Sequence, residues 1–250
     1  MSKKTDSNLY TLLFAVGMVV VVGALLAGVA QVLKPTIDEN KRIEKQQNIL
    51  YAMGVNENDE SSAIFVADAR VGEEFKNYIT KQIVITNGTD VEEDDNAYLI
   101  DVKKEQTRAK DGEERRLPLF IGEKDGKTFY VAPIRGKGLW DAVWAYIAMD
   151  ENMVVQGAYF DHKGETAGLG ANIKERYFMD DFIGEHLKDQ QNNFVGIAVS
   201  KSNADPLNKD KTDNEVDAIA GATITGDGVA AMIKSELRLY VPYFQTLNSN

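Results

Sequence analysis

The hydrophobic pattern separates an apolar N-terminal stretch from a longer region of short, mixed segments. Residues 8–33 contain no charged side chain, and residues 12–29 are almost wholly apolar or small. A helix needs roughly 20 such residues to cross the hydrocarbon core of a bilayer. The pattern therefore predicts a transmembrane helix over residues 9–33.

The flanks of this stretch leave its processing and orientation open. Gly28-Val29-Ala30 resembles a signal-peptide cleavage site, but the apolar run is longer than the roughly 7–15 residues of a signal peptide, which favours an uncleaved anchor. Lys3 and Lys4 favour a cytoplasmic N-terminus over residues 1–8, yet four basic residues also follow the span. The charge rule is thus ambiguous, although a long C-terminal domain can be translocated regardless of its charge.

Helix signals continue beyond the span. Pro35 predicts the end of the membrane helix, because proline removes a backbone donor and restricts the residue before it. Apolar residues at helical spacing then predict a polar connecting helix within residues 34–54, stopped at Gly54.

Residues 55–250 read as one domain with strands in sequence and helices near the end. Apolar runs separated by short, glycine-containing loops are typical of neighbouring antiparallel strands. We therefore expect an α+β fold: one transmembrane helix followed by a single mixed α/β domain with a largely antiparallel sheet. The pattern predicts strands at 117–120, 127–133, 141–149, 153–160 and 194–199, and helices at 172–188 and 229–240.

Composition excludes several classes of function. The formal net charge is −11, and an acidic chain repels phosphate backbones, so we expect no nucleic-acid partner. The sequence has no cysteine, which excludes disulfides, thiolate metal ligands and iron–sulfur ligation. The only two histidines are scattered, and no serine stands in a nucleophile-elbow setting. We therefore expect neither metal-ligating nor catalytic side chains, and any redox chemistry must use another cofactor.

The stretch Asp217–Gly228 is the strongest candidate for a ligand site. It is filled by small residues, glycines and two threonines, and it leads into the predicted helix. Free amides at a helix start attract anions, and a phosphate could rest on or be attached to Thr225. The alternative is that Thr225 or Asp227 only caps the helix, and spacing alone favours the cap.

Two further glycine loops have both structural and functional interpretations. Gly136–Trp140 is either a turn before a buried strand or a place where the backbone lies close to a flat ligand. The loop at residues 161–170 places a histidine, a carboxylate and a hydroxyl among glycines, which would suit a polar binding rim.

Together these motifs resemble the FMN-binding domain family. The matching patterns are Gly-x-Gly-Leu-Trp, Gly-Glu-Thr-x-Gly-Leu-Gly and Gly-Ala-Thr-x-Thr, in that order. The resemblance implies that a flavin transferase joins FMN through its phosphate to Thr225 rather than Thr223. Two positions depart from the family pattern, Ala220 where Ser or Thr is usual and Ala167 where proline is usual. The cofactor-binding residues implied by the resemblance are Thr225, Thr223, Gly221, Ala222, Gly138, Leu139, Trp140, Glu165, Thr166 and Leu169.

The resemblance also implies a place in a membrane complex. Within the family the chain is similar to electron-relay subunits of the sodium-pumping NADH:quinone oxidoreductase, and also to those of the Rnf ferredoxin:NAD complex. It implies other membrane subunits as partners and no complete active site on this chain. It implies the bacterial inner membrane, with residues 55–250 on the periplasmic side and the FMN motifs within residues 130–240. Two alternatives stay open: a membrane-anchored domain that binds flavin non-covalently, and a structural subunit in which Thr225 is only a cap.

Overall fold

The computed structural model describes residues 8–59, 62–201, 205 and 207–248. The chain divides into two units, Met1–Arg42 and Ile43–Asn250. The helices and strands are α1 (Asn8–Ala52), α2 (Asp68–Tyr78), β1 (Ile79–Thr86), β2 (Asp90–Glu93), η2 (Ala97–Leu99), α3 (Val102–Lys110), β3 (Leu117–Lys124), β4 (Lys127–Lys137), β5 (Ala142–Met149), β6 (Val155–His162), η3 (Gly170–Lys174), α4 (Arg176–Asp181), β7 (Ala198–Val199), β8 (Glu215–Val216), α5 (Thr223–Leu237), η4 (Arg238–Tyr240) and α6 (Val241–Leu247).

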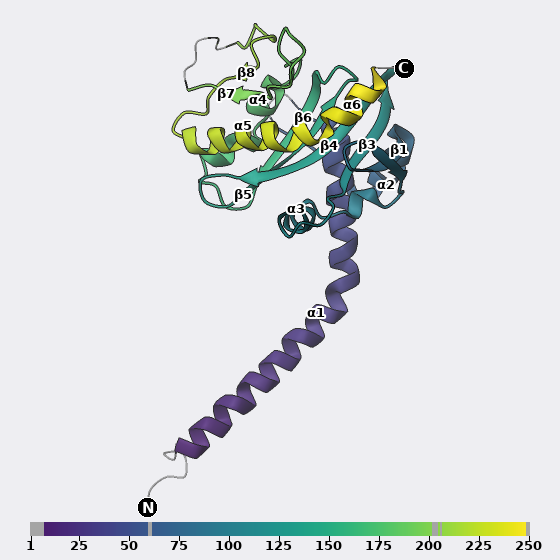
Figure 1. The fold of residues 1–250 in the computed structure, drawn as a ribbon. Helices are drawn as coiled ribbons and strands as arrows, with labels where there is room; N and C mark the ends of the chain where they lie inside the picture. Colours follow the sequence, from purple (N-terminus) through teal and green to yellow (C-terminus); the bar gives the residue numbers. More distant parts are fainter. Residues whose placement is uncertain (1–7, 60–61, 202–204, 206, 249–250) are drawn as a thin grey trace, which may run out of the picture. The chain divides into compact units, whose positions relative to one another are not determined.

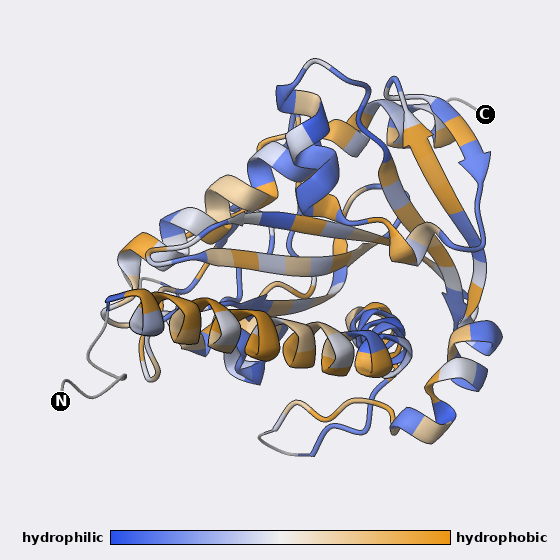
Figure 2. Ribbon diagram, turned by 90° about the horizontal axis from the view of Figure 1, so that it is seen from below, coloured by the Kyte–Doolittle hydropathy of each residue, from blue (hydrophilic) through white to orange (hydrophobic). Residues whose placement is uncertain are grey.

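The first unit consists of the greater part of α1. Its most apolar 18-residue window has a mean hydropathy of 2.7 and is not buried inside the protein. In Figure 2 this part of the helix is coloured mainly orange, with pale bands of near-neutral hydropathy between the hydrophobic residues. By length and composition the helix is able to cross a membrane.

Pro35 does not interrupt α1, which differs from the expected break. The helix continues through Pro35 to Ala52. A proline costs one local backbone hydrogen bond, and the residues on either side of this one continue in helical conformation.

The second unit is built on a six-stranded antiparallel sheet with the strand order β2-β1-β3-β4-β5-β6. This confirms the predicted fold class (Figure 1). The four strands from β3 to β6 follow one another in the chain and in the sheet, which explains why their hairpin signals were readable. β5 is buried along nearly its whole length, so this strand is covered on both faces.

Glycines in the sheet make room for the helices that cover it. A Cβ atom at Gly157 would lie 2.2 Å from the carbonyl oxygen of Ala52, at the end of α1. On the opposite face, a Cβ atom at Gly136 would lie 2.6 Å from the Cβ atom of Met232 in α5. The β4–β5–β6 register places Gly157 and Gly136 on opposite faces. The sheet is therefore packed between the last turn of α1 and α5.

Several sequence-based boundaries were wrong. The expected helix over 172–188 is only η3 and α4, and Gly184, with φ +87°, lies in the irregular segment that follows. The expected strand over 194–199 is reduced to β7, which pairs in parallel with β8. The charged segment over residues 107–116 is mostly exposed, and its first residues form the end of α3, a helix whose N-cap is Asp101. α5 begins at Thr223, six residues before the predicted start, and this last difference changes the site.

Candidate functional site

The β4–β5 loop supplies the first wall of the site. Its turn is closed by a hydrogen bond from the amide of Gly138 to the carbonyl of Asp141 (2.8 Å). Gly138 is needed here because a Cβ atom would lie 2.6 Å from Oε1 of Glu165. The loop therefore presents its backbone to a carboxylate from the next loop.

The loop between β6 and η3 supplies that carboxylate. Glu165 is buried, and its amide donates to Nδ1 of His162 (3.1 Å), which fixes the start of the loop. The amides of Leu169 and Ala171 both donate to the carbonyl of Thr166 (3.1 Å each), so the chain turns tightly above Glu165.

The start of α5 supplies the third side. Its N-cap is Ala222, which makes no side-chain cap, and the amide of Gly226 donates to the Ala222 carbonyl (2.9 Å). Thr225 therefore lies inside the first turn. The capping interpretation of Thr225 is wrong, because helical geometry begins two residues earlier. Asp227 is also no cap, since it lies within α5 and forms an exposed ion pair with Lys201 (3.4 Å).

A buried hydrogen bond joins the second and third motifs. The hydroxyl of Thr225 donates to Oε2 of Glu165 at 2.6 Å, and Thr225 is only 1% exposed. Gly170 allows this contact, because a Cβ atom there would lie 2.4 Å from Oγ1 of Thr225 and 2.6 Å from Oε2 of Glu165. The glycine is thus part of the site, although the sequence interpretation did not include it.

Glu165 is held in its ionised form. Burial raises the pKa of its carboxyl group, but the hydrogen bond from Thr225 opposes burial. Backbone amides of Trp140, Asp141 and Leu139 add further hydrogen bonds, and the pKa of Glu165 lies below its usual value. The Trp140 amide lies 2.9 Å from Oε1. A fixed negative charge therefore lies beneath the site at neutral pH.

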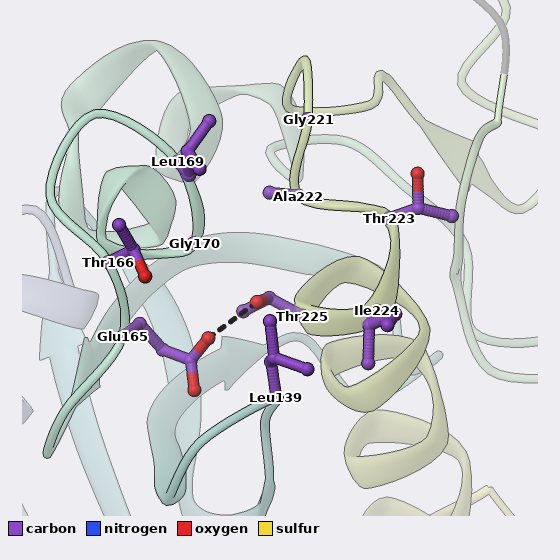
Figure 3. A pocket seen from close by; sticks show the side chains of 10 residues that line it. All are labelled: Leu139, Glu165, Thr166, Leu169, Gly170, Gly221, Ala222, Thr223, Ile224 and Thr225. Atoms are coloured by element: carbon purple, nitrogen blue, oxygen red, sulfur yellow. Dashed lines mark hydrogen bonds between the residues drawn. The ribbon is translucent and has the colours of Figure 1, made fainter.

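The three motifs enclose one cavity of about 250 Å³. Figure 3 shows its side chains, with Glu165 and Thr225 at the bottom and Thr223 pointing away from them. The cavity is lined by Leu139, Glu165, Thr166, Leu169, Gly170, Gly221, Ala222, Thr223, Ile224 and Thr225.

Most of the residues singled out from the sequence meet here, but two of them do not line the cavity. Gly138 lies behind Glu165, and Trp140 as a whole residue is 67% exposed. Trp140 instead ties two loops together, because its Nε1 donates to Oγ1 of Thr166 (3.2 Å). Gly170 and Ile224 were missed, although both stand next to motif residues.

The donor set suits a phosphorylated, partly apolar ligand. The first amides of α5, at Thr223–Thr225, precede the first intrahelical bond, and such amides favour anions. Leu139, Leu169 and Ile224 offer apolar contact. The chemistry of the residues present therefore fits FMN: the helix start suits a phosphate, and the apolar side chains suit a flat ring.

Comparison with known proteins decides the family. Residues 138–238 match the FMN-binding domain family. The C subunit of the Na(+)-translocating NADH-quinone reductase of Pseudomonas aeruginosa is 30% identical over 90% of this chain and 89% of that protein. The chain belongs to the family of these C subunits. The Haemophilus ducreyi protein of the same name is 32% identical over 90% of this chain and 87% of its own length.

Solved structures from the same family agree with the fold. The crystal structure of the Parabacteroides distasonis protein superposes with a TM-score of 0.71 at 30% identity, covering 85% of this chain and 96% of that one. The Shewanella oneidensis structure gives a TM-score of 0.66 at 23% identity, with 84% and 99% covered, and supports the fold alone. Of the two complexes left open by the sequence, the NADH-quinone reductase is the one that these relatives name.

Proposed function

We propose that this chain is the electron-relay subunit of a sodium-translocating NADH:quinone oxidoreductase and carries FMN joined through its phosphate to Thr225. The observation that carries the proposal is the meeting of three distant motifs around one threonine hydroxyl at the start of a helix. Bound flavin supplies the electron transfer, and the protein supplies position and electrostatics.

The side chains of the cavity have distinct tasks in this proposal. The amides at the start of α5 partly neutralise the phosphate charge. Leu139 and Leu169 keep water from one side of the ring. Thr166 offers a hydroxyl to a polar edge, and Glu165 sets the orientation of Thr225 before attachment. A covalent link keeps the flavin from diffusing away between turnovers.

The placement in the cell follows from α1 and from the relatives. We propose that residues 1–8 are cytoplasmic, that residues 9–33 span the inner membrane, and that 34–54 form a helical connector. Residues 55–250 then lie on the periplasmic side. The relatives are named as one subunit of an NADH-quinone reductase, so we assign the NADH and quinone sites to other subunits.

The test is the intact mass of the denatured full chain after co-expression with a flavin transferase. We expect a gain equal to FMN less water, and we expect Thr225→Ala to lose the gain while remaining folded. Thr223→Ala is the matched control, because Thr223 belongs to the same motif but points away from Glu165 (Figure 3). It should keep the added mass.

Each other outcome has a clear meaning. Colour that is lost completely on denaturation would indicate non-covalent binding. No gain in mass, with a transferase that modifies another substrate, would contradict the proposal. Loss of the gain in Thr223→Ala, with retention in Thr225→Ala, would place the attachment on the other hydroxyl.

A further inference from the structure

The hydrogen bond between Thr225 and Glu165 depends on a single proton. Oγ of Thr225 donates to Oε2 of Glu165 at 2.6 Å, so the hydroxyl hydrogen lies between the two oxygens (Figure 3). An ionised carboxylate can only accept hydrogen bonds, whereas a protonated carboxyl group can also donate one. The contact is therefore favourable only while one of the two oxygens carries a hydrogen.

Attachment of a phosphate to Thr225, as proposed above, removes that hydrogen. The Oγ–H bond is replaced by a bond from Oγ to phosphorus, and an ester oxygen can only accept a hydrogen bond. An ionised Glu165 would then face a second acceptor at 2.6 Å, a distance at which oxygens normally share a hydrogen. Either the two side chains separate or a proton returns to the contact.

The packing around Glu165 opposes separation. The amide of Trp140 donates to the other carboxylate oxygen, Oε1, at 2.9 Å. Backbone lies against both oxygens, because a Cβ atom would come within 2.6 Å of Oε1 at Gly138 and within 2.6 Å of Oε2 at Gly170. Glu165 and Thr225 are 7% and 1% exposed, so water has little access to the contact. The carboxyl group therefore has little room to withdraw from Oγ.

The electrostatics of the site favour the return of a proton. Burial is the largest influence on the pKa of Glu165 and raises it, and the hydrogen bond from Thr225 is the largest of those that lower it. Attachment removes this hydrogen bond and joins a negatively charged phosphodiester to the same hydroxyl oxygen. A like charge beside a buried carboxylate raises its pKa further.

The neighbouring charged groups do not neutralise the carboxylate. Within the parts of the chain that the structure describes, Glu165 forms no ion pair. Lys163 pairs instead with Asp141 at 2.8 Å, and in α5 Asp227 pairs with Lys201 at 3.4 Å. Nδ1 of the preceding histidine accepts the amide of the same glutamate, so this ring nitrogen carries no proton. An anion joined to the threonine would therefore act on the carboxylate without compensation.

We propose that attachment reverses the direction of this hydrogen bond, so that in the loaded chain Oε2 of Glu165 carries a proton and donates it to Oγ of Thr225. The inference rests on the proposed attachment at Thr225. Oε1 stays available to accept from the amide of Trp140, so the carboxyl group keeps its place. Glu165 thus acts as the proton acceptor of the attachment and holds that proton afterwards.

The bonds balance when the flavin arrives as a phosphoric anhydride of FMN. The Oγ–H bond and one anhydride P–O bond break, and the bond from Oγ to phosphorus forms. The leaving phosphate keeps the electron pair of the broken P–O bond. The proton from Oγ passes to Oε2, and nothing is oxidised or reduced.

The experiment is infrared spectroscopy of the full chain in detergent, with ¹³C in the side-chain carboxyl group of glutamate. The difference between labelled and unlabelled protein cancels the flavin carbonyls. The reference is the unmodified chain produced without a transferase. At a pH of about 8, Glu185 is mostly ionised in both preparations, since burial raises its pKa to about 7. We expect the loaded chain to gain about one protonated glutamate per attached FMN.

Two substitutions assign this signal. Glu165→Gln should abolish the gain, and its amide can still donate to an ester oxygen, so the loaded variant should stay folded. Glu175→Gln is the matched control, because Glu175 is exposed, and it should keep the gain. A further check needs no substitution: across partly loaded preparations, the gain should be proportional to the fraction of chains with the added mass.

Each other outcome counts against the inference. Added mass without a gain in protonated glutamate would overturn it and leave the proposed attachment intact. A gain that persists in Glu165→Gln would also overturn it, because the proton would lie on another glutamate. A chain that gains no mass with an active transferase would contradict the proposed function and this inference together.

Discussion

Gly138 and Gly170 lie on either side of the Glu165 carboxylate and leave space for it. A Cβ atom at either glycine would come within 2.6 Å of one of its oxygens. The carboxylate is therefore positioned by what the neighbouring residues lack as much as by its hydrogen bonds. Glycine is required at these two positions because any side chain would clash with the carboxylate, whereas glycine in many turns is required by a positive φ.

Gly170→Ala should disrupt the contact between Thr225 and Glu165. The added methyl group would force apart Thr225 and Glu165, and overpacking of this kind costs about 1–3 kcal/mol. We expect a lower free energy of unfolding in denaturant titration and a sharp loss of flavin attachment in the mass assay. Gly164→Ala is the matched control, because its nearest neighbour is Cβ of Asp141 at 3.8 Å. Equal behaviour of the two variants would contradict this account.

At the scale of residues, the sequence indicated most of the residues that line the cavity but not the contacts between them. The motifs around Glu165 and Thr225 were recognisable by their glycines and hydroxyls. The hydrogen bond between these two side chains was not, because they are 60 positions apart and no spacing rule joins them. The capping hypothesis for Thr225 failed because helix starts are among the least certain boundaries in a sequence.

At the scale of elements, the segment from 205 to 217 is attached to the end of α4. Nδ2 of Asn208 and Nζ of Lys211 both donate to the carbonyl of Asp181, at 2.8 and 2.7 Å. Oε1 of the buried Glu185 also accepts from Asn208 at 3.0 Å. Within the described residues, Oε2 of Glu185 has no hydrogen-bond partner. This segment leads directly into the third motif.

Glu185 gives this segment a pH dependence. Burial raises the pKa of Glu185 to about 7, although Asn208 and Lys211 oppose it. The folded chain therefore holds a proton that the unfolded chain has lost above its ordinary carboxyl pKa. Folding stability falls as pH rises from that ordinary value through about 7.

Glu185→Gln should consequently stabilise the protein above pH 7, by roughly 1–2 kcal/mol, since the amide carries no charge to desolvate. The advantage should shrink as the pH is lowered towards the ordinary carboxyl pKa. Thermal melts of both proteins across this range would measure it, with the exposed Glu215→Gln as control. A difference that does not change with pH would show that Glu185 does not titrate as described.

The order of β3 to β6 was predictable because each hairpin connects neighbours in the sheet. The region from 172 to 216 was not, because its structure depends on contacts with other elements. One example is the pairing of Val199 with Val216, which only the fold brings together. Local pattern alone cannot reveal such pairings.

At the scale of the whole molecule, the absence of cysteine makes the proposed topology directly testable. Single cysteines can be introduced at Ser7, before α1, and at Ser62, in the second unit, without background labelling. We expect a membrane-impermeant maleimide to label Ser62→Cys in cells with a permeabilised outer membrane. Ser7→Cys should react only after the inner membrane is also opened. The reverse pattern would invert the orientation.

The burial of Thr225 has a consequence for biogenesis. A hydroxyl that is 1% exposed beneath Gly170 is not accessible to a second enzyme in this folded state. The attachment proposed for Thr225 would therefore have to come before the loop at residues 164–170 has settled, or during its transient opening. The relative timing of folding and cofactor attachment would then decide how much protein carries flavin. Chains that fold before they meet the transferase would accumulate as folded protein without colour. The fraction of chains that carry the cofactor would measure how quickly attachment follows synthesis.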